Sequence, residues 1–185
     1  MKQGLLSEGS ESWLIAQSVE GCGGGTDVGH TAQFIDGFTF VTWNELRNDT
    51  QFKSQWNSLA QKATEPNAFG ESWYLESALA VLDTRGEVQL AILRAAGQIV
   101  GLASVYLARQ YAGLPIHSCQ NWLNHNAFLG TPLIAKGFER AFWAGFLSRL
   151  DSIPENALFL HLTGMAVDGP VAKALEAECS ATGRR

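Results

Sequence analysis

The chain has 185 residues and a formal net charge of −5, with 46% hydrophobic and 17% charged residues. This length is typical of one domain, and the apolar content allows a sizeable core, which excludes disorder over most of the chain. Lysine and arginine form no cluster, and a nucleic-acid-binding surface needs clustered positive charge to displace counterions from phosphates, so we expect no nucleic-acid partner.

The spacing of the cysteines and the length of the apolar runs bear on the cellular compartment of the protein. Cys22, Cys119 and Cys179 lie far apart without paired spacing, which is typical of reduced thiols in the cytoplasm. No apolar run approaches the roughly 20 residues that a membrane-spanning helix needs. A short apolar pair near the N-terminus is followed at once by polar residues, so it is no signal-peptide core. We therefore expect a cytoplasmic protein with no membrane span.

Residues 1–37 lack sustained hydrophobic periodicity, so we expect a flexible N-terminal segment there and a single domain over residues 38–182. The glycine-rich run at residues 21–25 resembles a phosphate-binding loop in composition. It lacks the Lys-Ser/Thr ending, and no helix pattern follows it. We therefore interpret this run as part of a linker.

A first strand is predicted at residues 38–43, which are mostly β-branched and aromatic. Asn44 or Asp49 can cap the helix that follows, because both have short acceptor side chains. Five apolar residues then share one helical face: Phe52, Trp56, Leu59, Ala60 and Ala63. Pro66 ends this helix, since proline disfavours α geometry in the residue before it.

A second helix is predicted at residues 73–82, with Ser72 as its cap. Two faces of this helix are apolar enough to point inward. One consists of Tyr74, Ala78 and Val81, and the other of Leu75, Leu79 and Leu82.

The central element is a β-hairpin over residues 87–109, in which two apolar runs are joined by a short loop that contains Gly97. Neither run alternates between apolar and polar residues. A strand that is apolar on both faces lies inside a sheet covered on both sides, so the remaining chain should supply helices for two faces.

The C-terminal half continues with a strand at residues 116–122, an Asn-rich loop at 123–129, a helix at 136–150, a strand at 157–162 and a last helix. The helix at 136–150 carries an aromatic and apolar stripe at spacings of four: Phe138, Phe142, Phe146 and Leu150. Asp168 is expected to cap the last helix, with Pro170 in its first turn and Gly183 at its C-terminal cap. Its apolar line is Val171, Leu175 and Cys179. The fold class is therefore α/β of the mixed α+β kind, a sheet between helices.

Several short motifs in this order resemble one family. They are WNSLAQKATEPNAF at residues 56–69, Ser72-Trp73, GQIVGL at 97–102, GLP at 113–115, Trp122 and GTPL at 130–133. This pattern, which runs roughly from Phe38 to Leu162, is similar to the N-terminal half of Fem-like, cellulose-biosynthesis-associated acetyltransferases, a branch of the GNAT superfamily.

The resemblance implies a GNAT-like half domain with a central mixed, largely antiparallel sheet, helices on both faces and an incomplete C-terminal end. It implies transfer of an acetyl or acyl group from acetyl-CoA, another acyl-CoA or a related donor to an amine or hydroxyl of a small-molecule or glycan acceptor. Cell-envelope or polysaccharide metabolism is the implied setting, and no metal is expected. The family has two tandem halves in a chain about twice this long.

One part of the family pattern is missing. The GNAT pyrophosphate loop, Arg/Gln-x-x-Gly-x-Gly/Ala, points backbone N–H groups and a helix dipole at phosphates. Its place between Trp122 and Lys136 holds the Asn-rich loop and Gly130-Thr131-Pro132 instead. Two hypotheses follow. The chain is an acyltransferase completed by a homodimer or a second GNAT-like half, or it is a non-catalytic binding or assembly half with an edge strand at 157–162 that must be covered.

Candidate site residues cluster in the loop after the strand at 116–122. Asn121, Trp122 and Asn124 suit a pocket for a polar acceptor, and His125 is the candidate base that removes a proton from it. The alternative is a loop whose Asn side chains satisfy the local backbone. Gly130 and Thr131 can present N–H groups and a hydroxyl to substrate, or can simply form a turn.

Two other chemistries are disfavoured. His117 and Cys119 share one face of a strand near His125, but a structural metal site usually needs four ligands and the spacing matches no zinc signature. No Gly-x-Ser-x-Gly elbow is present, which disfavours a serine hydrolase.

Overall fold

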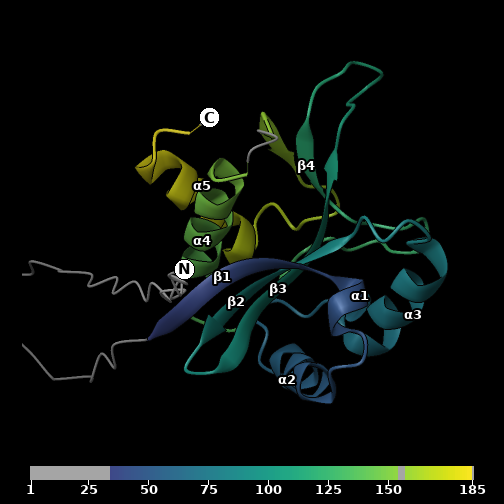
Figure 1. The fold of residues 1–185 in the computed structure, drawn as a ribbon. Coiled ribbons are helices and arrows are strands. Elements are labelled where there is room, and N and C mark those ends of the chain that lie inside the picture. The colour runs from purple at the N-terminus through teal and green to yellow at the C-terminus, as the bar shows by residue number, and fades with distance from the viewer. Residues whose placement is uncertain (1–33, 154–156, 185) are drawn as a thin grey trace, which may run out of the picture.

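The computed structural model describes residues 34–153 and 157–184 (Figure 1). The glycine-rich run, Cys22 and most of the expected N-terminal segment lie outside the described residues. The helices are α1 (Trp43–Leu46), α2 (Thr50–Ala60), the 3-10 turn η1 (Ala68–Gly70), α3 (Ser72–Leu82), α4 (Glu139–Asp151) and α5 (Pro170–Ala181). The strands are β1 (Ile35–Thr42), β2 (Gln89–Ala95), β3 (Gln98–Ala108), β4 (Ser118–Asn121), β5 (Leu133–Ile134) and β6 (Phe159–His161).

The described strands form a six-stranded sheet in the order β1-β2-β3-β4-β6, with β5 paired to β3. The pairs are antiparallel except β4 and β6, which are parallel and are connected through α4. This mixed α/β architecture, with a mostly antiparallel sheet, confirms the predicted fold class. No helix in the described ranges is long and apolar enough to cross a membrane.

The predicted central hairpin is β2 and β3, and both strands lie inside the sheet. Ala96 (φ 48°) and Gly97 (φ 73°) form the two-residue turn between them, and positive φ at both positions is the geometry that matches strand twist. A register shift follows, since Leu93 pairs with Gly101 and Arg94 with Ile99. Val100 is therefore an extra residue in β3, as in a β-bulge.

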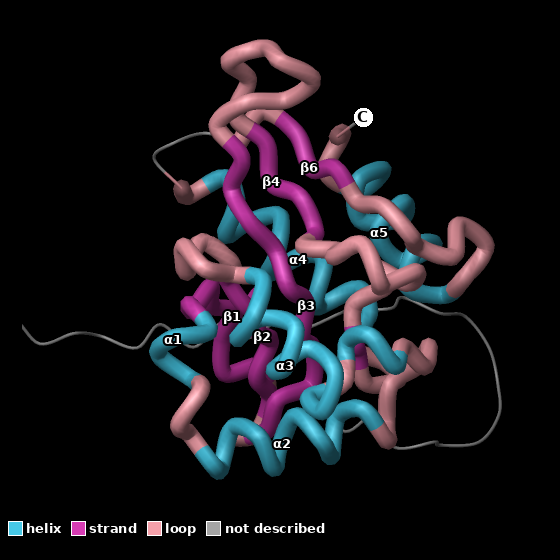
Figure 2. Tube along the Cα trace, turned by 90° about the vertical axis from the view of Figure 1, so that its right-hand side faces the viewer, coloured by secondary structure: helices cyan, strands magenta, loops and turns pink. Residues whose placement is uncertain are grey.

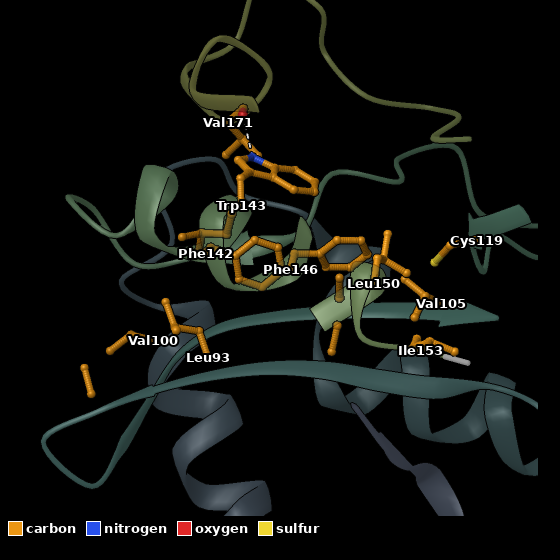
Figure 3. Close-up of a cluster of buried hydrophobic side chains, with 14 residues drawn as sticks. Leu93, Val100, Val105, Cys119, Phe142, Trp143, Phe146, Leu150, Ile153 and Val171 are labelled. Atoms are coloured by element: carbon orange, nitrogen blue, oxygen red, sulfur yellow. Dashed lines mark hydrogen bonds between the residues drawn. The ribbon is translucent and has the colours of Figure 1, made fainter. Parts of the chain in front are cut away.

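Helices cover both faces of the sheet, as the hairpin pattern predicts. One face packs on α4 and α5, where Leu93, Val105 and Cys119 meet the aromatic side chains of α4 (Figure 3). The other face packs on α1, α2 and α3, where Leu90, Ile92 and Leu102 meet a second buried cluster. Figure 2 shows α2 and α3 over the β1–β3 part of the sheet, while β4 and β6 extend past them.

Several predicted boundaries and caps are wrong by a few residues. Trp43 begins α1 instead of ending the first strand, and it is buried. Asp49 caps α2 as predicted, accepting a hydrogen bond from the Phe52 N–H at 2.9 Å. Ser72 does not cap α3, because its hydroxyl donates instead to Asn57 of α2, and Glu71 takes the cap position. α3 buries Leu75 and Leu79 while the predicted third member, Leu82, is exposed.

The start of the last helix is held by Glu65, which lies far from it in the sequence. Asp168 is not its cap. Gly169 occupies the N-cap position, and it has no side chain that could accept a hydrogen bond from the helix. The Val171 N–H donates instead to the Glu65 carboxylate at 2.9 Å, across 106 residues of sequence. A carboxylate at a helix N-terminus satisfies a free N–H group and interacts favourably with the helix dipole. The predicted C-terminal cap is confirmed, since Gly183 has φ 70° and Arg184 N–H bonds back to Cys179 O.

The remaining boundaries also differ slightly. The strand predicted at residues 116–122 is Ser118–Asn121, and the one predicted at 157–162 is Phe159–His161. The helix predicted from residue 136 begins at Glu139, because Gly137 adopts φ 90°, which is not helical. Its stripe is confirmed for Phe142, Phe146 and Leu150, which are buried.

Candidate functional site

The candidate site lies where the parallel strands β4 and β6 end. Three residues of each strand pair, from Ser118 with Phe159 to Gln120 with His161. Beyond this point the strand pairing between β4 and β6 ends, and a loop follows each strand. Ligands in open sheets with parallel strands commonly bind outside the carboxyl ends of such strands, so this edge is the place to look for a site.

Asn121, the last residue of β4, joins the loop after β4 to the segment after β6 through its side-chain amide. Its Oδ1 accepts hydrogen bonds from the Thr163 N–H at 2.9 Å and the Thr163 hydroxyl at 3.3 Å. Its Nδ2 donates to Thr163 O at 2.8 Å and Gly130 O at 3.4 Å. The side chain is buried, and its donors and acceptor are engaged within the chain. Asn121 therefore positions the loops around the site, and its amide is not free for a ligand in this conformation.

Gly130 fits in this arrangement because it has no Cβ. Its N–H donates to Gly164 O at 2.9 Å. A Cβ built on Gly130 would lie 2.1 Å from Thr163 O and 2.2 Å from Asn121 Nδ2, far inside van der Waals contact. The chain after β6 can approach the GTPL segment this closely only at a glycine.

A small cavity opens beside these loops and collects most of the predicted site residues. Its lining includes all five predicted substrate-binding residues, namely Asn121, Trp122, Asn124, Gly130 and Thr131. The cavity has a volume of about 30 Å³, which is enough for about one water molecule. The predicted base, His125, is exposed in the same loop and is not part of this lining. The five residues therefore lie together around one cavity, but the enclosed space holds only a small group.

Asn67, which was not singled out from the sequence, anchors the other wall of the cavity. It is buried, its Nδ2 donates to Thr131 O at 2.7 Å and to Leu129 O at 3.3 Å, and its Oδ1 accepts from the Phe69 N–H at 3.0 Å. In the sequence, Asn67 stands out only as a member of the motif at residues 56–69 on which the family resemblance rests.

Four aromatic side chains form a continuous row beside this cavity, with two exposed rings at its ends and two half-buried rings between them. We call this set, Phe69, Trp73, Tyr74 and Phe128, the aromatic row. Neighbouring rings meet edge to face, with centroid distances of 5.8 Å for Trp73–Tyr74, 5.0 Å for Tyr74–Phe69 and 5.7 Å for Phe69–Phe128. Phe69 lines the cavity. The Tyr74 hydroxyl donates to Asn124 Oδ1 at 3.0 Å, which ties the row to the Asn-rich loop.

The N-terminus of α4, where a GNAT enzyme would hold the donor pyrophosphate, is occupied by a carboxylate of the chain itself. Glu139 accepts a hydrogen bond from the Gly137 N–H at 2.9 Å and another from the Thr64 hydroxyl. A carboxylate beside the first turn already complements the helix dipole and repels a second anion. The glycine pattern of the GNAT loop is missing from this sequence, and the Glu139 carboxylate lies beside the first turn of α4 instead.

The described residues contain no cluster of three or more His, Cys, Asp and Glu side chains that could hold a metal ion. Cys119, considered above as a possible ligand, points into the core between the sheet and α4 (Figure 3). Burial raises the pKa of its thiol to about 12. A metal ligand must be a thiolate, so burial opposes this role.

Cys119 is accordingly expected to resist alkylation in the folded protein. At neutral pH the buried thiol stays protonated, whereas an unfolded thiol ionises near pH 9.0. Stability from this residue is therefore present at neutral pH and is lost as pH rises from about 9 toward 12. Peptide mapping after iodoacetamide treatment should find Cys119 unmodified in native protein and modified in urea. Rapid labelling of native Cys119 would contradict the placement.

Comparison with known proteins adds no relative: no family model, no curated protein and no solved structure matches this chain. The fold and the site define a mixed α/β domain with a small cavity of mixed polar and apolar lining at the carboxyl end of β4, and with exposed aromatic side chains nearby.

Proposed function

We propose that this domain is the acceptor-holding half of a GNAT-type acyltransferase, which transfers an acyl group from acyl-CoA or a related donor to an amine or hydroxyl. The observation that carries the proposal is the position of the cavity. It lies at the carboxyl end of β4, beside the crossover through α4 to the parallel strand β6, and its lining includes the Asn124 amide and the Thr131 hydroxyl as groups for a polar acceptor.

The chemistry requires a base that this cavity lining does not contain. In the proposed reaction the acceptor nitrogen or oxygen attacks the thioester carbonyl, the C–S bond breaks and CoA leaves as a thiolate that takes a proton. The acceptor must lose a proton to a base. Among the described residues that line the cavity none is Asp, Glu, His, Lys or Cys. His125, which follows the lining residue Asn124, is the base that we assign.

For the acyl donor, this chain lacks the glycine loop that binds phosphates in GNAT enzymes. Because Glu139 occupies the start of α4, we propose that a second copy of the chain or a second GNAT-like half supplies the groups that hold the donor phosphates. The transfer reaction then depends on association, and it rises more steeply than linearly with protein concentration in the range where the complex forms.

The test combines a binding and an activity measurement. Acetyl-CoA should raise the melting temperature, because a ligand that binds only the folded state stabilises it, by about 2.7 kcal/mol at 100 times its Kd. Labelled acetyl-CoA should transfer its acetyl group to an amine or sugar acceptor. His125→Gln should reduce this transfer by about 100-fold or more, within the usual range for loss of a general base.

His161→Gln is the matched control, because His161 lies on β6, meets the Tyr111 ring edge to face and is not part of the cavity lining. It should retain the activity of the unmodified chain. Absence of both a melting-temperature shift at millimolar acetyl-CoA and any acetyl transfer, at concentrations where the chain is self-associated, would contradict the proposal.

A non-catalytic binding or assembly half is the second candidate, and the size of the cavity favours it. A space of about 30 Å³ does not enclose an acceptor, and the Asn121 amide is already satisfied within the chain. This candidate predicts a stable dimer or a complex with a second GNAT-like half. A monomer in sedimentation that still transfers acyl groups would reject it.

A further inference from the structure

We propose that β1 is the strand through which two copies of this chain pair edge to edge, in antiparallel orientation, to form one continuous sheet. This inference does not rest on the proposed function, because β1 lies at the opposite edge of the sheet from β4 and β6, where the candidate site lies (Figure 1). The observations that carry it are the length of this edge, the absence of charge along most of it and the helix that holds it in place.

The two edges of the sheet differ in length. β6, at one edge, has three residues, and such a short strand offers another chain little to pair with. β1, at the other edge, has eight residues. In the part of the chain that the structure describes, β1 pairs only with β2, so the backbone groups on its outer side have no strand partner. A long strand with an unpaired side is a template for pairing with another chain.

β1 also lacks the side chains that usually prevent edge pairing. Residues 38–42 contain no charged side chain and no Pro, and they pair with β2 without a break in register. The register shift and the one charged side chain of the strand, Asp36, lie at its start. Asp36 is turned toward the hairpin, since its carboxylate accepts a hydrogen bond from the Gly97 N–H at 2.6 Å. No charge therefore protects the outer edge of residues 38–42.

The helix α4 holds β1 in a fixed position. Phe38 and Phe40 are half-buried and meet the Phe146 ring edge to face, at centroid distances of 5.8 Å and 5.4 Å. The helix comes close to the strand at Gly145, where an added Cβ would lie 2.9 Å from the Phe38 Cβ. A strand that is already fixed by packing loses little further conformational freedom when it pairs, which favours association.

A second copy of the chain fits this edge, because two identical strands in antiparallel orientation are complementary to each other. A two-fold axis near Thr39 would place this residue beside its counterpart, and Phe38 opposite Phe40 of the other copy, as cross-strand aromatic pairs. The two Asp36 side chains would then lie at opposite ends of the paired strands. Parallel pairing in register would place them side by side, which is unfavourable for like charges.

The first test measures the mass of the full chain in solution and the effect of a charge at the centre of the edge. Sedimentation velocity should find a dimer at about 100 μM protein. Thr39 is exposed, and Thr39→Lys adds a positive charge to a chain of net charge −5, so it lessens the overall repulsion between copies. It should nevertheless raise the dimer Kd by about tenfold or more, because it brings two lysines together.

A mixture of two variants identifies the contact. Thr39→Glu should weaken self-association as Thr39→Lys does. Mixed in equal amounts, the two variants should form a dimer with a Kd near that of the unmodified chain, because Lys then faces Glu across the contact. Only positions that lie close to each other in the dimer can restore association in this way. Thr84→Lys, at an exposed position in the loop between α3 and β2, is the matched control and should dimerise as the unmodified chain does.

Hydrogen exchange tests whether the backbone of β1 takes part. The amides of residues 38–42 should exchange more slowly at concentrations where the chain is a dimer than where it is a monomer. The amides of β3, which is paired on both sides within one chain, should exchange at the same rate in both. This measurement needs no variant, so it decides the question even if a substitution at Thr39 prevents folding.

Two results would overturn the inference. One is a full chain that stays monomeric at about 100 μM, and the other is a dimer that Thr39→Lys leaves intact and in which exchange of the β1 amides is not slowed. Leu158→Lys, at a position 75% exposed just before β6, tests the opposite edge. A dimer that Leu158→Lys disrupts and Thr39→Lys does not would be formed through β6 instead.

These outcomes are separate from those that test the proposed function. A partner bound at β1 lies away from the candidate site, so loss of the β1 dimer in Thr39→Lys should leave any acetyl transfer unchanged. Absence of acetyl transfer would contradict the acyltransferase proposal and leave the β1 contact standing. Acetyl transfer by a chain that does not pair through β1 would do the reverse.

Discussion

Trp143→Ala is expected to lower the free energy of unfolding by about 4 kcal/mol, within the usual range for removing a fully buried tryptophan. The indole ring is completely buried and packs edge to face with Phe142 and Phe146 of the same helix, at centroid distances of 5.2 Å and 5.5 Å. Its Nε1 donates to Val171 O at 2.9 Å, so the ring also fastens α5 to α4 (Figure 3). The variant loses this packing and the hydrogen bond from Trp143 to the Val171 carbonyl.

Urea denaturation followed by circular dichroism measures this loss. Trp73→Ala is the control, because the ring is mostly exposed and its removal should change stability by less than about 0.5 kcal/mol. Trp143→Phe keeps an aromatic ring and removes the hydrogen bond, so its stability should lie between those of the unmodified protein and the alanine variant. A Trp143→Ala variant as stable as the unmodified chain would contradict the placement of α5 on α4.

Gly130→Ala is expected to cost about 3 kcal/mol of stability and to disrupt the candidate site. The added Cβ would lie 2.1 Å from Thr163 O and 2.2 Å from Asn121 Nδ2. One of these is a backbone atom, so the loops must move apart and the hydrogen bonds between Asn121 and Thr163 must lengthen or break. A buried amide that loses its partners costs about 1 to 3 kcal/mol, and the shifted backbone adds strain.

Gly113→Ala separates this steric effect from simple backbone strain. Gly113 has φ 80° and nothing within 4 Å of a built Cβ, so its substitution should cost only about 1 kcal/mol of conformational strain. Thermal denaturation of both variants, with and without acetyl-CoA, gives stability and ligand response together. Equal, small effects of the two substitutions would show that the loops at Gly130 are not packed as described.

Local patterns in the sequence predicted much of the fold. The doubly apolar runs at residues 87–109 identified the interior hairpin, Asp49 identified the start of α2, and Gly183 identified the end of α5. These features depend on interactions within a few residues, or on a strand whose two faces are both covered, so the nearby sequence contains the information.

The candidate site was predictable in part. The five predicted substrate-binding residues line one cavity because they come from one stretch of the chain, the end of β4 and the loop that follows it (121–131). Asn67 and the rings of Phe69, Trp73 and Tyr74 join them from a segment about 50 residues earlier, and nothing in the local pattern indicated this.

The sequence by itself determined the main strands and helices and that the sheet is covered on both faces, because hydrophobic periodicity is a property of neighbouring residues. The short elements α1, η1 and β5 were not predicted. Only the tertiary structure decided that Glu65 caps α5, that Asn121 joins the loop after β4 to the chain after β6, and that Trp73 and Phe128 lie exposed near the cavity. Each of these is a contact between segments far apart in the chain, and the hydrogen bonds and the exposed surface they create exist only after those segments pack together.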